Sequence, residues 1–155
     1  MSEVRKELKV SAIENGTVID HIPAGVVSQV MRILQLEKIE RPVLIAANLN
    51  SKKLGKKGII KVTDKFFESN EINKIALIAP NATLIVIKDY EVVYKKNVEL
   101  PKAIKQFVKC MNPNCITNHE SFDTKFDVHL TDEKKVTLLC NYCEKFTGQG
   151  NMTFI

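Results

Sequence analysis

The sequence predicts an α+β protein with two domains, of which the first is a ferredoxin-like antiparallel sheet with two helices and the second is small and all-β. Three observations support this prediction. The chain has 155 residues, of which 45% are apolar and 26% are charged, as is typical of soluble globular proteins. All four cysteines lie between Cys110 and Cys143. Residues 1–100 hold 16 Lys and Arg against 12 Asp and Glu, whereas residues 101–155 hold 7 against 6, so most of the +5 net charge lies in the cysteine-free part.

The boundary between the two domains is expected at Pro101. Proline restricts the residue before it, Leu100, to extended conformations, which is typical of a connection between domains. We therefore expect domains at 1–100 and 101–155.

The first part of the N-terminal domain alternates strands and helices. Apolar and polar residues alternate over 8–12, which predicts a strand ending at the Asn15-Gly16 turn. Residues 17–22 predict a second strand. Pro23 is compatible with the first turn of a helix, and an apolar face at helical spacing then continues to about Leu36.

The remaining elements of this domain follow the same alternation. The apolar stretch 42–49 predicts a strand, the polar stretch up to Gly58 a loop, and 59–62 a short strand. Ser69 is a candidate helix cap, and Pro80 ends that helix.

The last two elements are strands at 83–87 and 91–95, which read as a hairpin. The order of strands and helices from residue 17 onward, with short connections, predicts the ferredoxin-like layer.

The C-terminal domain carries two short-looped cysteine pairs. The first pair is Cys110-x4-Cys115 and the second is Cys140-x2-Cys143, with 24 residues between the pairs. Two such pairs can present four sulfurs to one tetrahedral Zn²⁺. A segment of about fifty residues buries little apolar surface, so a structural zinc would supply much of its folding free energy. The domain is therefore expected to be of the zinc-ribbon or rubredoxin-like type.

Other interpretations of the cysteines are weaker. Two disulfides are an alternative, but no secretory signal accompanies the cysteines. His119 could be a ligand, although four cysteines already complete the shell. A deaminase-type His-x-Glu is absent, because Glu120 follows His119 directly. The predicted site is structural.

Two further features of the N-terminal domain could bind a ligand. Five lysines and two glycines fall within residues 52–61, which suits a phosphate contact or, equally, a solvated hairpin tip. Asp20 and His21 are adjacent, and since successive residues of a strand face opposite sides, we expect only one of them to reach a ligand. The sequence contains no nucleophile–base motif typical of an enzyme.

Several motifs together resemble the regulatory chain of aspartate carbamoyltransferase. They include residues 16–25 (GTVIDHIPAG), the Gly-Lys-Lys loop leading into 59–61, 79–83 (APNAT), 90–93 (YEVV) and the two cysteine pairs. The resemblance is collinear over essentially the whole chain.

The resemblance implies a non-catalytic subunit with an N-terminal nucleotide-binding domain for CTP, ATP and UTP, and a C-terminal zinc domain that attaches to the catalytic chain of aspartate carbamoyltransferase. It also implies a homodimer of regulatory chains, a role in pyrimidine biosynthesis and one structural Zn²⁺ held by Cys110, Cys115, Cys140 and Cys143. The implied nucleotide-binding residues are Val10, Ala12, Ile13, Val18, Asp20, His21, Ile59, Lys61, Ile87, Tyr90, Val92 and Lys95. Lys57 is a further candidate contact.

One position departs from the family pattern. Ile85 stands where some relatives carry asparagine, and an isoleucine side chain cannot form a hydrogen bond, so discrimination between CTP and ATP is open.

The competing interpretation is a nucleic-acid-binding zinc ribbon. The cysteine-bearing part is almost neutral and aromatic residues make up 6% of the chain, whereas nucleic-acid binders gather basic and stacking residues on one face. This charge distribution leads us to expect no nucleic-acid partner. No apolar run is long enough to span a membrane, so we expect a cytoplasmic protein that does not bind membranes.

Overall fold

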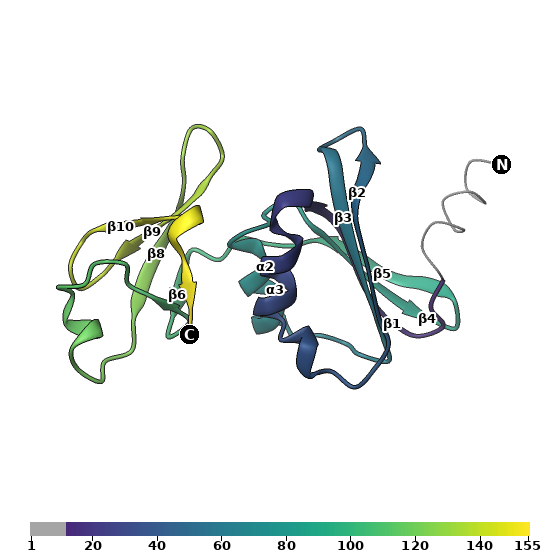
Figure 1. The fold of residues 1–155 in the computed structure, drawn as a ribbon, viewed down its shortest axis with the longest axis horizontal. Helices are drawn as coiled ribbons and strands as arrows, with labels where there is room; N and C mark the ends of the chain where they lie inside the picture. Colours follow the sequence, from purple (N-terminus) through teal and green to yellow (C-terminus); the bar gives the residue numbers. More distant parts are fainter. Residues whose placement is uncertain (1–11) are drawn as a thin grey trace. The chain divides into compact units, whose positions relative to one another are not determined.

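The computed structural model describes residues 12–155, and the chain divides between Glu99 and Leu100 into two compact units (Figure 1). The two units are described separately below. Of the strand expected over 8–12, only Ala12 is among the described residues.

The first unit is built on a five-stranded sheet with strand order β2-β3-β1-β4-β5, and every neighbouring pair is antiparallel. This is the ferredoxin-like order with β5 added beside β4. The strands are β1 (Gly16–Pro23), β2 (Val43–Ser51), β3 (Gly55–Thr63), β4 (Thr83–Lys88) and β5 (Glu91–Asn97).

Two helices cover one face of this sheet, as Figure 1 shows. They are α2 (Val27–Ile33) and α3 (Ser69–Ala76), and two single 3-10 turns, η1 (Ala24–Val26) and η2 (Leu36–Lys38), flank α2. The core lies between sheet and helices, where Ile19 and Ile60 are opposite one another and fully buried.

Gly58 allows α2 to approach the sheet closely. A Cβ at residue 58 would lie 2.1 Å from Cγ2 of Val27, which no real contact permits. The face of β3 that holds Gly58 and Ile60 is therefore the helix-covered face, and Ile59 and Lys61 point to the opposite side.

Three sequence expectations need correction in this unit. The stretch 50–58, expected as a loop, belongs mostly to the β2–β3 hairpin, because antiparallel pairing continues through Asn50 opposite Lys56. Helix α2 ends at Ile33, since Gln35 adopts a left-handed conformation. The N-cap of α3 is Glu68, not Ser69, and the Glu68 backbone N–H donates to the carboxylate of Glu71 at 3.1 Å.

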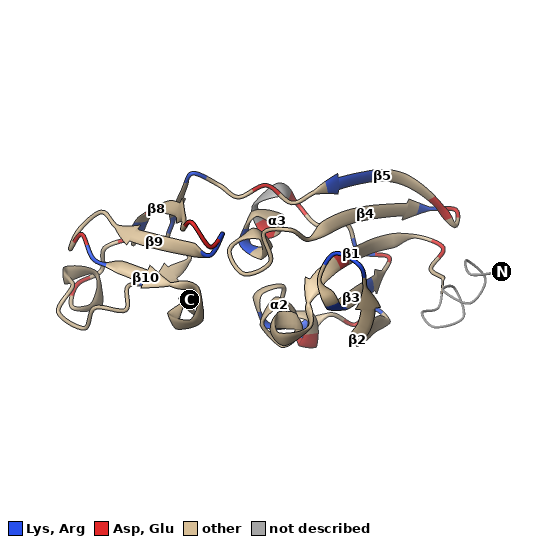
Figure 2. Ribbon diagram, turned by 90° about the horizontal axis from the view of Figure 1, so that it is seen from above, with Lys and Arg blue, Asp and Glu red and all other residues tan. Residues whose placement is uncertain are grey.

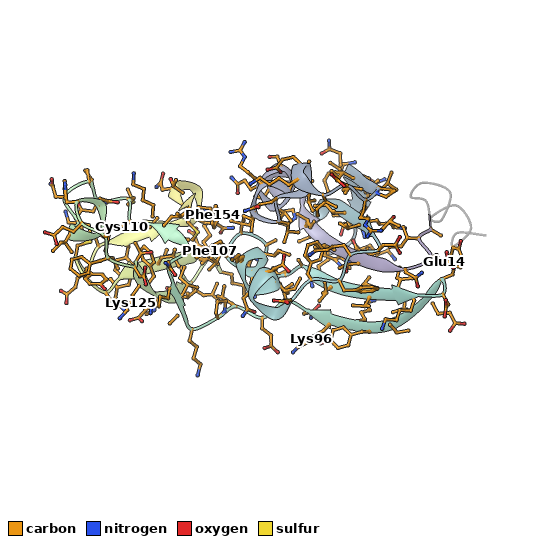
Figure 3. All side chains as sticks on the ribbon, turned by 90° about the horizontal axis from the view of Figure 1, so that it is seen from below. Glu14, Lys96, Phe107, Cys110, Lys125 and Phe154 are labelled. Carbon is orange, nitrogen blue, oxygen red and sulfur yellow. The ribbon has the colours of Figure 1, made fainter. Side chains whose placement is uncertain are left out.

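The second unit contains a four-stranded antiparallel sheet, in the order β10-β9-β8-β6, and a two-stranded ribbon of β11 and β7. The strands are β6 (Ala103–Lys105), β7 (Val108–Lys109), β8 (Lys125–Leu130), β9 (Val136–Cys140), β10 (Phe146–Gly148) and β11 (Thr153–Phe154), with 3-10 turns η3 (Ile116–Asn118) and η4 (Gln149–Asn151). Phe126 and Leu138 fill its small core. Phe107 and Phe154 close one side, with ring centroids 5.1 Å apart (Figure 3). The structure thus has the α+β class and the all-β second domain that the sequence predicts.

Candidate functional site

The face of the first sheet opposite α2 and α3 brings together residues that are far apart in the sequence. Val18 on β1 lies opposite Lys61 on β3 and opposite Ile85 on β4, and Ile85 in turn lies opposite Lys95 on β5. Directly opposed residues of antiparallel strands share a face, so these four form one row across the sheet. We call this side of the sheet the open face.

One end of the open face is apolar. Gly16 lies opposite Ile87, which lies opposite Val92. The turn between β4 and β5 is tied to the segment before β1, because the Tyr90 backbone N–H donates to the Glu14 carbonyl at 2.9 Å. The Tyr90 side chain is 67% exposed and Val92 is 60% exposed, so both are available to a ligand.

The other end of the open face is charged and hydrogen-bonded. The Lys57 ammonium donates to Oδ1 of Asp20 at 2.8 Å, and both side chains are largely buried. Nδ1 of His21 lies 3.2 Å from Oγ1 of Thr83, which donates to Oδ1 of Asn97 at 3.2 Å. These five residues connect four neighbouring strands, β3, β1, β4 and β5.

The structure contradicts the expectation that Asp20 and His21 face opposite sides of the sheet. The register between β1 and β3 shifts between Ile19 and Ile22, and His21 has a φ of 57°. The extra residue and the left-handed backbone turn the imidazole toward Thr83, which lies opposite Asp20. Both side chains therefore reach the open face.

The surroundings of His21 favour its neutral form. Burial lowers the pKa of His21 below its usual value of 6.5, and the positive charges of Lys57, Lys53 and Lys95 lower it further, against the opposing effect of Asp20. The positive charges of three lysines thus disfavour protonation of one imidazole. A bound anion would offset these charges.

The dimensions of the open face suit an elongated ligand. Gly16 and Asp20 are four residues apart on β1, which corresponds to about 13 Å along a strand. A ligand of this length could lay an apolar, planar part near Tyr90 and an anionic part near Lys57 and His21. Figure 2 shows Lys and Arg on β3 and β5, the strands that carry Lys57, Lys61 and Lys95.

Most of the residues implied by the resemblance meet on this face. They are Val18, Asp20, His21, Ile59, Lys61, Ile87, Val92 and Lys95. Tyr90 occupies the β4–β5 turn, and Ala12 and Ile13 precede the residues bonded to it. Val10 lies outside the described residues.

Sequence reasoning missed two members of the charged end, Thr83 and Asn97. Thr83 ends the 79–83 motif, which by itself gives that residue no role, and Asn97 lies in no motif; only the pairing of β4 with β1 and β5 places both beside His21.

The second candidate site is a cluster of four cysteine sulfurs in the second unit. Cys110 and Cys143 have their sulfurs 3.6 Å apart, Cys115 and Cys140 have theirs 3.8 Å apart, and all four lie within 4.8 Å of one another. Four sulfurs at about 2.3 Å from one tetrahedral zinc are separated by about 3.8 Å. The cysteines are free, so the disulfide alternative does not describe this structure.

The loops that carry the sulfurs are held by backbone and amide hydrogen bonds. The Cys115 N–H donates to the Asn112 carbonyl at 3.0 Å, and the Asn118 amide donates to the carbonyls of Cys110 and Asn112. In the second loop, the Cys140 N–H donates to the Lys145 carbonyl. His119 is exposed and is not a member of the cluster.

The thiols differ in acidity. Burial raises the pKa of Cys110 and that of Cys140. For Cys143 burial also acts upward, but the Asn112 side chain, the Lys145 backbone N–H and the thiols of Cys110 and Cys140 together lower its pKa to about 7. The thiolate is the form of cysteine that binds a metal cation.

These observations define a class of protein: a two-domain chain with an exposed, cationic sheet face and a cluster of four thiols that can supply a complete set of protein ligands to one metal ion. A site with four protein ligands is structural, because catalysis needs an open coordination position. Between residues 12 and 155, no helix is long and apolar enough to cross a membrane.

Comparison with known proteins gives the particular family. The family model for the allosteric domain of the aspartate carbamoyltransferase regulatory chain matches residues 8–99. The family model for the metal binding domain of that chain matches residues 102–153. The chain belongs to the family of aspartate carbamoyltransferase regulatory chains. It is therefore a regulatory chain and not a catalytic one.

Curated relatives agree over nearly full length. The regulatory chain from Bacteroides fragilis is 49% identical over 155 residues, covering 100% of both chains. Those from Pyrococcus abyssi and Thermococcus sibiricus are 55% identical over 141 residues and 52% identical over 147, covering 90% and 95% of this chain and 91% and 95% of theirs. The comparisons support the regulatory chain rather than the nucleic-acid-binding zinc ribbon.

Proposed function

We propose that this chain senses CTP, ATP and UTP on the open face of its first unit and transmits their binding to a catalytic chain of aspartate carbamoyltransferase through its second unit. In this role it tunes pyrimidine biosynthesis in the cytoplasm without performing chemistry itself. The observation that carries the proposal is the open face, which joins an apolar end at Ile87 and Val92 to a cationic end at Lys57 and Lys95.

The apolar end suits the base of a nucleotide. Ile87 and Val92 offer apolar surface, and the backbone around Glu14 and Tyr90 lies beside it. As the family resemblance implies, main-chain groups beside Ile13 would read the polar edge of the base without any side-chain donor.

The cationic end suits the triphosphate. Its lysines surround His21, and ammonium groups bind phosphates as point charges. Asp20 holds Lys57 in place at 2.8 Å and thereby positions its charge before the ligand arrives.

The second unit would attach to the catalytic chain and hold one structural Zn²⁺ through Cys110, Cys115, Cys140 and Cys143. A bound zinc would supply folding free energy and no reaction step. We further propose that two regulatory chains pair through their first units, as the family resemblance implies.

Regulation then requires a coupling free energy between the open face and the catalytic chain. Couplings of this kind are about 1–3 kcal/mol. A nucleotide shifts the equilibrium only if it binds the two quaternary states unequally.

Calorimetric titration of the full chain with CTP, ATP and UTP tests nucleotide sensing. Saturable binding is expected, and no heat at millimolar nucleotide would overturn it. Co-purification with the matching catalytic chain tests the second unit, sedimentation analysis tests the pairing, and a gel shift with DNA distinguishes the nucleic-acid alternative.

Ile85 gives a test of base discrimination. Its side chain lies in the middle of the open face and offers no hydrogen bond. We expect Ile85→Asn to change the ratio of CTP to ATP affinity by about two- to ten-fold, the worth of one neutral hydrogen bond. An unchanged ratio would show that this position does not read the base.

A further inference from the structure

The four-cysteine cluster has a net charge that its surroundings must balance. Four thiolates around one divalent cation leave two negative charges in a centre whose Cys110, Cys115 and Cys140 are buried. Buried thiolates need hydrogen-bond donors, since donors near a metal ligand orient it and stabilise its charge.

The donors differ from one sulfur to the next. Backbone N–H groups of Tyr142 and Cys143 act on Cys140, and the Asn112 side chain acts on Cys143. At Cys115 the contact is a hydroxyl: Oγ1 of Thr117 lies 3.2 Å from the sulfur.

A short rigid turn holds this hydroxyl in place. Cys115 is the N-cap of η3, and Thr117 is the central residue of that turn. The Asn118 N–H donates to the Cys115 carbonyl at 2.9 Å, and the Asn118 amide bonds the carbonyl of Cys110 at 3.0 Å. The turn therefore fixes Thr117 relative to both cysteines of the first pair.

A metal at the cluster would settle the direction of the hydrogen bond. A metal-bound sulfur is a thiolate with no proton to give, so the hydroxyl must donate and the sulfur must accept. Oxygen to sulfur distances of 3.2 Å fit such a charge-assisted bond.

We propose that Thr117 is a positioning residue of the metal centre, whose hydroxyl donates to the Cys115 thiolate and slows loss of the metal. This inference rests on the proposed metal site but not on nucleotide sensing or on the catalytic partner. It assigns a metal-stabilising role to a side chain that is not a ligand.

The test uses the full 155-residue chain loaded with zinc, in the natural form and as Thr117→Val and Thr117→Ser. Valine keeps the shape of threonine and removes the donor, whereas serine keeps the donor. The measurement is the rate of zinc release to an excess of a chromogenic chelator. We expect release from Thr117→Val to be about ten- to a hundred-fold faster, the usual effect of losing such a partner. Release from Thr117→Ser should stay close to that of the natural chain, because serine keeps the donor.

Cobalt provides a second readout that packing alone would not move. In the Co²⁺-loaded chain, the sulfur-to-metal charge-transfer band should shift in Thr117→Val and not in Thr117→Ser. If the valine variant does not fold, Thr117→Ala compared with Thr117→Ser isolates the hydroxyl, because both lack the methyl group.

Three results would overturn the proposal. Unchanged release and spectrum in Thr117→Val would show that the hydroxyl does not matter. Equal losses in the valine and serine variants would assign the effect to the methyl group. A natural chain that binds neither zinc nor cobalt would remove the metal site as well, without touching the proposed nucleotide sensing.

Discussion

The two units of this chain are stabilised in different ways. The first unit buries a layer of isoleucine, leucine and valine between its sheet and helices α2 and α3, with Ile19, Ile60 and Ile75 fully buried. The second unit places three of its four cysteines among a much shorter set of buried apolar residues, which includes Phe126 and Leu138. A unit with a large apolar core between its sheet and helices can leave the second face of the sheet free for a ligand. A small unit buries little apolar surface, so its four cysteines are needed to stabilise its fold.

The largest expected effect is on the stability of the second unit when one of its four cysteine sulfurs is removed. In Cys140→Ser the metal site loses a buried ligand, and structural zinc is worth about 10–16 kcal/mol in small domains. We expect residues 100–155 to unfold while the first unit stays folded. Limited proteolysis and circular dichroism of the full chain check this. If both units of Cys140→Ser resist protease as in the natural chain, the second unit does not depend on its cysteine cluster for stability.

The next largest effect is on nucleotide affinity, from a substitution on the open face that leaves the core of the first unit unchanged. Lys57→Gln removes the ammonium that Asp20 holds and leaves that carboxylate without its lysine partner beside the proposed triphosphate site. Hydrogen bonds to charged groups are worth about 1.5–3 kcal/mol, so nucleotide affinity should fall about ten- to a hundred-fold. Calorimetry measures it.

Lys56 offers the matched control for that variant. It neighbours Lys57 on β3, is exposed, and bonds Asn50 on β2. Lys56→Gln should leave nucleotide affinity nearly unchanged, and an equal loss in both variants would mean that net charge, not the site, governs binding.

A third variant tests how tightly the core of the first unit is packed. In Gly58→Ala the new Cβ would meet Cγ2 of Val27, so Val27 at the start of α2 must shift away from β3. Overpacking of this kind costs about 1–3 kcal/mol. Denaturant unfolding of the first unit should shift accordingly, with metal binding by the second unit unaffected; a midpoint equal to that of the natural chain would refute tight packing there.

The smallest expected effect is a pH dependence of nucleotide binding. Burial and nearby lysines hold the pKa of His21 below 6.5 in the free chain, and a bound triphosphate should raise it. Since the complex then binds the proton more tightly, affinity should strengthen as pH falls from above the pKa of the complex toward that of the free chain, and level off below it. Calorimetry across mildly alkaline to mildly acidic buffers measures the slope.

His21→Gln separates this effect from ionisation of the nucleotide itself. The natural chain should show the steeper pH dependence, and identical slopes in the two chains would exclude His21 as the titrating group.

The same imidazole affects stability in the opposite direction. A His whose folded pKa is lowered stabilises the fold above the unfolded pKa of 6.5, and this contribution is lost as pH falls through the folded value.

The sequence by itself determined the two-domain organisation and the grouping of the four cysteines. The spacing of Cys110, Cys115, Cys140 and Cys143 is a local pattern, because each short loop presents two sulfurs regardless of what surrounds it. The alternation of strands and helices in the first unit was also readable, since it depends on hydrophobic periodicity along the chain.

Only the tertiary structure decided what the open face contains. Thr83 and Asn97 join His21 through strand register, and the bulge at His21 reverses the direction that simple alternation predicts. Thr117 became part of the metal centre for the same reason: the turn after Cys115 returns its hydroxyl to the sulfur. Motifs record neighbours along the chain, whereas register, bulges and turns place side chains in space, and hydrogen bonds depend on that placement.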